Sequence, residues 1–169
     1  MSRFVKQFRA VFGRAEPESE EQAYWRFVSR KSDRAYWKLM LRSVHESDIH
    51  GVRMPGFPSQ DIQRMFVGSA EEHALREGYN FYRIVKGYCA RFGAPIKPTS
   101  RILDFGCGWA RIARFFFKDV KGSNFYGVDV DPEMISFCQA AMPCGTYSVV
   151  PARPPMSFGS ESLDVIFAY

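Results

Sequence analysis

The sequence predicts an α/β fold in which a parallel sheet is preceded by an α-helical N-terminal extension. Three observations lead to this prediction. Short apolar runs that suit strands alternate with helical stretches beyond residue 100. Two of these runs end in an acid, at Asp104 and Asp129, and a turn with two glycines follows the first of them. Alternating strands and helices imply parallel strands joined by right-handed crossovers.

The first strand is expected at residues 101–104, within the stretch R-I-L-D-F-G-C-G-W-A-R. Gly106 and Gly108 lack a Cβ, so the chain can turn sharply there and a ligand can lie against the backbone. The run 109–117 contains no breaker and predicts a helix, whose first N–H groups would point outward. A G-x-G turn is by itself often only a tight turn. The second strand and its final acid favour a binding site.

The second strand is expected at residues 125–129. Its final acid, Asp129, lies 25 residues after Asp104, a spacing typical of an acid that accepts ribose hydroxyls. Asp131 then provides an N-cap, and Pro132 suits the first position of a helix running to about residue 141. Strand, glycine turn, helix, strand, acid and capped helix therefore appear in the order of a nucleoside site.

Three motifs resemble those of class I S-adenosylmethionine-dependent methyltransferases. The turn is G-x-G-x-A, with Arg111 where a dinucleotide-binding turn has its third glycine, and it resembles the family's first motif. V-D-V-D-P-E-M-I at 128–135 resembles the second motif, and P-P-M-S-F-G-S-E-S-L-D-V-I-F-A-Y at 154–169 resembles the approach to the fourth strand. The resemblance implies a Rossmann-like sheet of seven strands. The sequence to Tyr169 supplies four, the last two at 146–150 and 163–167, so the sheet is expected to be incomplete.

The resemblance also implies the cofactor S-adenosyl-L-methionine and a role for each matching residue. Gly106, Cys107 and Gly108 would lie against its methionine part, and Asp104 would help to hold the amino end. Asp129 would accept both ribose hydroxyls, and Val130 would pack on the adenine. For both acids a purely local capping role is the alternative. Residues 148–158 contain no acid or amide for the adenine amine, so backbone groups or Met156 would have to serve.

The expected activity is methyl transfer to an unidentified small-molecule or sugar-like acceptor. Displacement on a sulfonium depends largely on positioning, and the family's acceptor-side residues follow later strands, so no catalytic residue and no metal ligand is assigned. A nicotinamide-dependent oxidoreductase or epimerase is an alternative, against which Arg111 counts. A non-catalytic docking domain is another.

Composition narrows the class of protein. The net charge is +5, but four basic residues lie within the first 14, which argues against a broad nucleic-acid face. No apolar run is long enough for a transmembrane segment, and no signal core is present. The four cysteines form no C-x-x-C pair, which favours free thiols in a cytoplasmic protein.

The N-terminal part is expected to be a helical extension with a lid loop over residues 1–68, and the cofactor-binding domain to span 69–169. Residues 1–14 form an amphipathic pattern that would dock on a membrane surface or a protein, or pack on the domain itself. Helices are expected over 23–44, with a break at Ser32 and Asp33, and 46–66 is expected to be a loop or lid. A capping box at 69–72 predicts a helix that stops before Gly93. The family resemblance implies that Tyr79 or Tyr82 of this helix would close the cofactor pocket, and the alternative is that both belong to the core.

Overall fold

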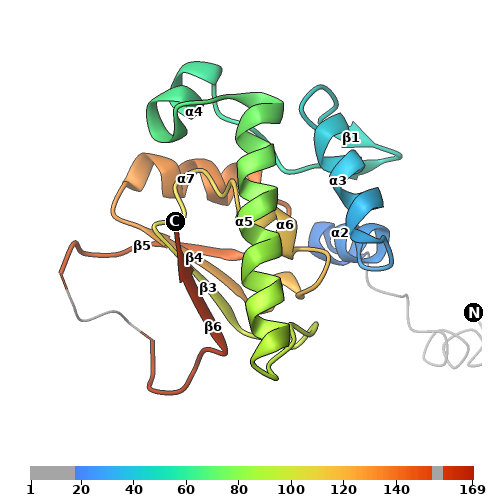
Figure 1. Cartoon of the computed structure of the whole chain (residues 1–169). Helices are drawn as coiled ribbons and strands as arrows, with labels where there is room; N and C mark the ends of the chain where they lie inside the picture. Colours follow the sequence, from blue (N-terminus) through green and yellow to red (C-terminus); the bar gives the residue numbers. More distant parts are fainter. Residues whose placement is uncertain (1–17, 154–157) are drawn as a thin grey trace, which may run out of the picture.

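The computed structural model describes residues 18–153 and 158–169, and it contains the expected parallel sheet (Figure 1). The expected N-terminal helix at 1–14 and Met156 lie outside the described residues. Four parallel strands have the order β5-β4-β3-β6, and their bounds are β3 Ile102–Phe105, β4 Phe125–Asp129, β5 Thr146–Val149 and β6 Val165–Ala168. The four strands predicted from the sequence are confirmed to within two residues at each end. The fold is therefore Rossmann-like over this segment.

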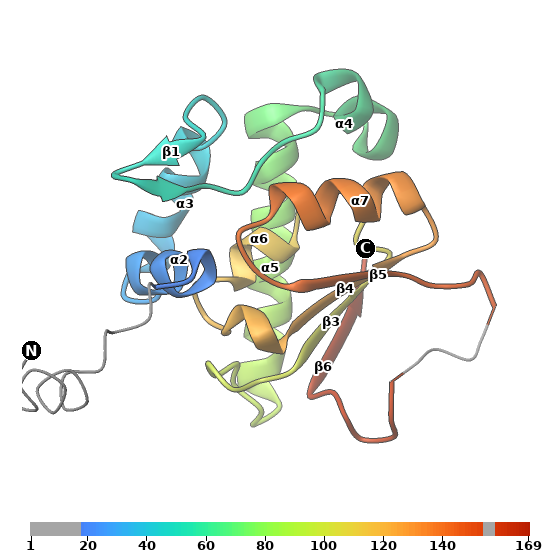
Figure 2. The same cartoon turned by 180° about the vertical axis from the view of Figure 1, so that it is seen from behind.

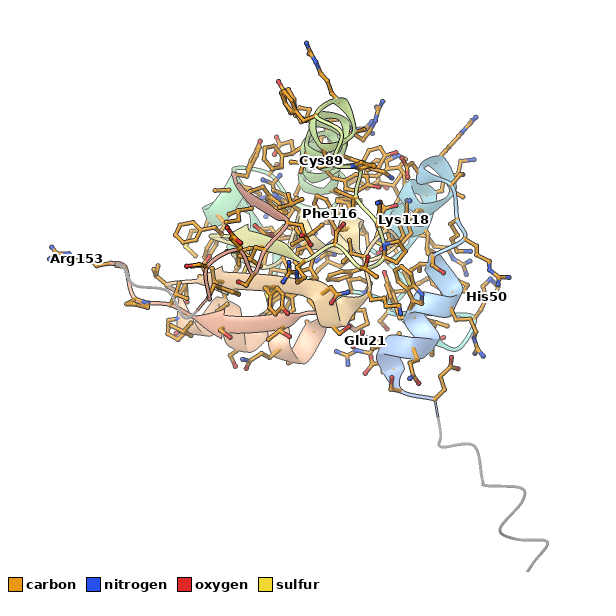
Figure 3. The ribbon with its side chains drawn as sticks, turned by 90° about the horizontal axis from the view of Figure 1, so that it is seen from below. Glu21, His50, Cys89, Phe116, Lys118 and Arg153 are labelled. Carbon is orange, nitrogen blue, oxygen red and sulfur yellow. The ribbon has the colours of Figure 1, made fainter. Side chains whose placement is uncertain are left out.

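One face of the sheet is packed against helices. Asp104 lies between Phe167 and Gly127 in the strand register, and Gly127 lies beside Tyr147, so these four residues share a face. Phe167 of this face contacts both α5 (Glu71–Arg91), through Phe81, and α6 (Ala113–Phe116), through Phe116. Figure 3 shows Phe116 in the middle of the packed side chains. The other helix of the domain is α7 (Pro132–Ala141), which begins at its Asp131 cap as predicted.

The helix predicted over 109–117 is wrong in length. Only α6, four residues long, is helical, and the turn continues to Ile112. The reason is a backbone conformation that the sequence does not announce. Ala110 has φ 60°, in the left-handed region, as do Gly106 at 76° and Gly108 at 49°. A left-handed residue cannot continue a right-handed helix, so the helix starts after it.

The N-terminal helices are α2 (Glu20–Val28) and α3 (Asp33–Arg42), and the predicted break between them is confirmed. Ser32 caps α3 by accepting a hydrogen bond from Ala35 N at 3.2 Å. The two helices are tied to α6 through buried tyrosines. The hydroxyls of Tyr24 and Tyr36 lie 2.8 Å apart, and that of Tyr36 donates to the carbonyl of Arg114 at 2.6 Å.

The segment 46–66 is more ordered than the predicted loop. It contains a hairpin of β1 (Asp48–Ile49) and β2 (Val52–Arg53), and helix α4 (Gln60–Val67). His50 and Gly51 form the hairpin turn with φ of 58° and 75°, the two positive values of a type I′ turn. Helix α4 starts at the N-cap Ser59 and ends at Gly68, which has φ 72°.

The capping box predicted at 69–72 is wrong. Helix α5 begins at Glu71, and its N-cap Ala70 makes no side-chain hydrogen bond. Gln63 of α4 supplies the missing acceptor instead, because its Oε1 accepts from Glu71 N at 2.8 Å. Gln63 is buried, and its amide nitrogen donates to Pro58 O at 2.9 Å. The end of α5 before Gly93 is confirmed.

Charged side chains also join the extension to the domain. Lys118, which is buried, lies 2.7 Å from Asp33 of α3 and 2.7 Å from Asp119. Lys86 of α5 contacts the same two carboxylates at 3.1 Å. Figures 2 and 3 show α3 beside α5, with Lys118 on that side of the molecule. A division of the chain at residue 68 stays a prediction. Within the described ranges, no helix has the length and apolarity that a membrane span needs.

Candidate functional site

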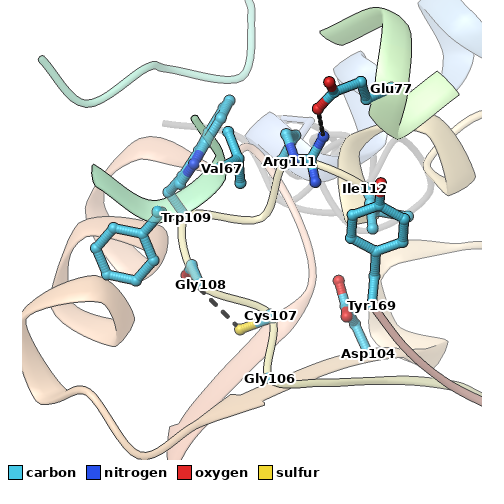
Figure 4. Close-up of a pocket in the computed structure, with 11 residues that line it drawn as sticks. Val67, Glu77, Asp104, Gly106, Cys107, Gly108, Trp109, Arg111, Ile112 and Tyr169 are labelled. Carbon is cyan, nitrogen blue, oxygen red and sulfur yellow. Dashed lines mark hydrogen bonds and ion pairs between the residues drawn. The ribbon is translucent and has the colours of Figure 1, made fainter. Parts of the chain in front are cut away.

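A pocket of about 400 Å³ lies at the carboxyl ends of β3 and β6 (Figure 4). This is the end of a parallel sheet at which α/β proteins bind ligands. Its walls come from the glycine turn, from α4 and α5, and from the residue after β6. The lining residues are Phe66, Val67, Glu77, Asp104, Gly106, Cys107, Gly108, Trp109, Arg111, Ile112 and Tyr169.

Asp104 is the buried acid of the pocket. Its Oδ2 is buried and receives no hydrogen bond from the described residues. The pKa of its carboxyl is raised to about 8, because burial and then the charge of Asp129 raise it more than the charge of Arg111 lowers it. In Figure 4 the carboxylate points toward Arg111 and Tyr169. A buried carboxylate without a partner is costly, so the site suits a ligand that brings a cation or a donor.

The glycine turn leaves its backbone open to a ligand. A Cβ on Gly106 would meet nothing within 4 Å, and one on Gly108 would meet only Phe66, at 3.7 Å. Both glycines have positive φ, which side chains rarely adopt, so glycine is needed here for conformation rather than for space. The turn is tied to β4, because Gly106 N and Cys107 N both donate to Val128 O, at 2.8 and 3.0 Å.

Asp129, at the end of β4, binds the backbone of the same turn. Its Oδ2 accepts from Gly108 N at 2.7 Å, and its Oδ1 accepts from Asp131 N at 3.0 Å. The carboxylate is thereby fixed between the glycine turn and the cap of α7, and each oxygen keeps further acceptor capacity. Asp129 and Val130 do not line the pocket itself. They lie beside it at the end of β4, and Val130 is 57% exposed.

Cys107 lines the pocket, but its thiol belongs to the interior. Its Sγ would lie 3.1 Å from a Cβ on Gly127, and the thiol of Cys138 from α7 is its neighbour. This thiol contact and burial both raise the pKa of Cys107, so the group stays protonated and is no nucleophile. Cys138 Sγ in turn donates to Gly108 O at 3.3 Å. The two thiols pack the inner side of the turn.

The sequence did not reveal the charged pair at the opposite end of the pocket. Arg111 is 4% exposed, and its Nη1 donates to Ala74 O and to Glu77 Oε2, both at 3.1 Å. Its guanidinium also lies 4.9 Å from the centre of the Tyr169 ring. The only sequence signal was an arginine in place of a third glycine. The partner on α5 is 34 residues away and could not be inferred from spacing.

Helix α4 supplies the apolar side of the pocket through Phe66 and Val67. Trp109 of the glycine turn packs near Val67, and its indole N–H has no partner among the described residues. The lid expected over 46–66 thus includes a residue that reaches the site. Tyr79 and Tyr82 do not line the pocket. Tyr79 stacks on Trp37 at 4.8 Å, and Tyr82 is buried, so the core interpretation of both is the better one.

The arrangement suits a small polar molecule with a nucleoside at one end. An acid at the end of β4 can accept paired hydroxyls, an open glycine backbone lies next to it, and a buried acid and a buried arginine lie beyond. The groups expected to hold S-adenosylmethionine therefore fit that cofactor. Among the residues with described side chains, no group of three or more His, Cys, Asp or Glu could hold a metal ion.

The family comparison agrees with this arrangement. Residues 102–169 match the model of a family described as "Methyltransferase domain". No curated protein matches the sequence. Among solved structures, a protein from Thermoplasma acidophilum aligns with 17% identity and a TM-score of 0.32 over 53% of this chain. The aligned part spans 46% of that protein's length.

Proposed function

We propose that this chain, whose residues 102–169 match the methyltransferase-domain family, binds S-adenosyl-L-methionine and transfers its methyl group to a small-molecule acceptor. The observation that carries the proposal is the buried Asp104 carboxylate, which faces the pocket without a partner among the described residues, beside an open glycine turn. Asp129 lies on the other side of that turn, as a nucleoside site requires.

Each residue has a separate role in the proposal. Asp104 binds the ammonium of the methionyl end, and Gly106 and Gly108 let the ligand lie against the backbone. Asp129 accepts the ribose hydroxyls, and its bond to Gly108 N holds the turn in place for them. Val130, more than half exposed, provides apolar surface for the adenine.

The chemistry that the cofactor supplies when bound is a methyl group on a sulfonium, which leaves as a neutral thioether. The protein's contribution is therefore to orient and to exclude water. The apolar residues of α4 that line the pocket exclude water from that side. The acceptor, a small or sugar-like molecule, is proposed by resemblance, and no residue is assigned to it.

The test is isothermal titration calorimetry of the 169-residue protein with S-adenosylhomocysteine, with the nicotinamide dinucleotides titrated in parallel. We expect saturable binding of the first ligand and no heat from the others. Asp129→Ala should weaken the affinity for S-adenosylhomocysteine at least about tenfold, because it removes charge-assisted hydrogen bonds to the ribose.

Asp61→Ala is the matched control, because the Asp61 side chain is 97% exposed on α4. It should leave the affinity unchanged. Absence of binding by the wild-type protein would refute the proposal, and so would an Asp129→Ala variant that binds as tightly as the wild type. Heat with a nicotinamide dinucleotide instead would favour an oxidoreductase.

A further inference from the structure

We propose that Arg111 binds the α-carboxylate of the cofactor's methionyl end, opposite Asp104, and so makes the pocket specific for an intact α-amino acid. This inference rests on the proposed function and adds a recognition residue to it. The observation that supports it is that Arg111 and Asp104 line the same pocket but form no ion pair with each other.

Arg111 is fixed by the fold but only partly satisfied. Its Nη1 makes both of its hydrogen bonds, to Ala74 O and to Glu77 Oε2 of α5. A guanidinium has five N–H donors, and Nε and Nη2 make no hydrogen bond within the described residues. A nearly buried cation whose fork is half unused suits a carboxylate, which such a fork binds with two parallel hydrogen bonds.

Asp104 and Arg111 face the same cavity but do not pair with each other. Both residues line it, yet no ion pair within 4.0 Å joins them among the described side chains. Glu77 and Ala74 O hold the arginine on the α5 side, while Asp104 is fixed at the end of β3. A guanidinium and a carboxyl that a bound ammonium would ionise, kept apart across one small pocket, are complementary to a zwitterion. An α-amino acid is such a zwitterion, because its ammonium and its carboxylate are on the same carbon. Its ammonium would face Asp104, and its carboxylate would face Arg111.

The position of the pair relative to the nucleoside acid supports the same orientation. Asp129 and Val130 lie at the end of β4 and outside the pocket, whereas Arg111, Glu77 and Tyr169 lie on the β6 side. In the sheet order, β3 with its glycine turn lies between β4 and β6 and so separates the two groups. A ligand with its ribose at Asp129 and its chain along the turn would therefore reach Arg111 with its amino-acid end.

A purely structural role for Arg111 explains less. Glu77 has a side chain that is 48% exposed, and ion pairs of exposed groups contribute little to stability. Burying a guanidinium is costly unless its donors are paired. The pair with Glu77 therefore accounts for the position of Arg111 but not for its unused donors.

The first experiment uses the wild-type protein and three ligands in calorimetry. S-adenosylhomocysteine has both amino-acid charges, its decarboxylated form keeps only the ammonium, and 5′-methylthioadenosine has neither. We expect the decarboxylated form to bind at least about tenfold more weakly than S-adenosylhomocysteine, as the loss of a charge-assisted pair requires. Equal affinities would overturn the inference while leaving the proposed function intact. No binding of any ligand would refute the proposed function instead.

The second experiment assigns the preference to Arg111. Arg111→Gln should lower the affinity for S-adenosylhomocysteine to that for the decarboxylated form. The affinity for 5′-methylthioadenosine should stay within about twofold of the wild-type value, and this retained binding would also show that the site is folded. Arg111→Lys keeps the charge without the fork and should retain part of the preference. Arg83→Gln, on the exposed side of α5, is the matched control and should retain all of it.

If the Arg111→Gln variant fails to fold, the Arg111→Lys variant decides the question. A lysine variant with the full wild-type preference would overturn the inference. So would a glutamine variant in which all three affinities fall by the same factor, because that pattern describes a general loss of packing.

Discussion

Replacing Asp104 by asparagine should stabilise the ligand-free protein near neutral pH while weakening ligand binding at its site. The carboxyl of Asp104 has its pKa raised to about 8, first by burial and then by the charge of Asp129. In an unfolded chain the same carboxyl has a pKa near 3.8. Between these two values the folded state keeps a proton that the unfolded state has released. The contribution of this carboxyl to the free energy of unfolding is therefore fully present below about pH 4 and is lost as the pH rises toward 8.

The size of the effect follows from that interval. Each pH unit costs about 1.4 kcal/mol of unfolding free energy, so by pH 7 the loss approaches about 4 kcal/mol. Asparagine carries no such penalty, but it leaves a buried amide without partners, which costs about 1 to 3 kcal/mol. At pH 7 we expect Asp104→Asn to be more stable than the wild type by about 1 to 3 kcal/mol.

The assay is urea unfolding followed by tryptophan fluorescence at several pH values between about 4.5 and 8, the range over which the linkage acts. The difference between Asp104→Asn and the wild type should grow with pH, whereas Asp61→Asn, at an exposed position, should follow the wild type throughout. If the variant is no more stable at neutral pH than the wild type, or if the difference does not shrink toward the acid end, the carboxyl is not held protonated by burial.

Two further predictions concern the same turn and the strands beneath it. Because Asp104 is protonated at neutral pH in the free protein, an ammonium ligand should ionise it, so binding of S-adenosylhomocysteine should release about one proton. Calorimetry in buffers of different ionisation enthalpy measures this release, and a release that persists in Asp104→Asn would assign it elsewhere. Gly127→Ala should destabilise the protein by about 1 to 3 kcal/mol in thermal unfolding, since its Cβ would lie 2.6 Å from Tyr147 Cδ1. Gly87→Ala, where a Cβ meets nothing within 4 Å in α5, is its control and should be neutral or stabilising.

The parts of the fold set by local signals were predictable. The strands at 102–105 and 125–129 and the cap at Asp131 depend on apolar runs and capping residues that lie next to each other in the chain. The helix over 109–117 was wrong because the left-handed Ala110 is imposed by the turn around it, not by its own preference. Helix α4 was missed although Ser59 and Gly68 mark its ends.

The candidate site likewise contains residues that could be predicted from the sequence and residues that could not. The acids and glycines at the strand ends could be predicted because a parallel sheet brings strand ends together. Glu77 and Phe66 could not, because they reach the pocket from helices whose placement depends on packing across the whole chain. The roles assigned to the predicted cofactor-binding residues stay predictions until a ligand is titrated.

The buried Arg114 has a practical consequence for anyone preparing this protein. Its Nη2 donates to Gly56 O at 2.9 Å, its guanidinium lies 4.2 Å from the centre of the Phe57 ring, and burial lowers its pKa to about 10. A recombinant boundary drawn at the start of the family match, residue 102, would delete both of these partners and the tyrosine that binds the Arg114 carbonyl. Solubility lost on such trimming would reflect an uncovered cation and its aromatic surroundings, not a defect of the segment that matches the family.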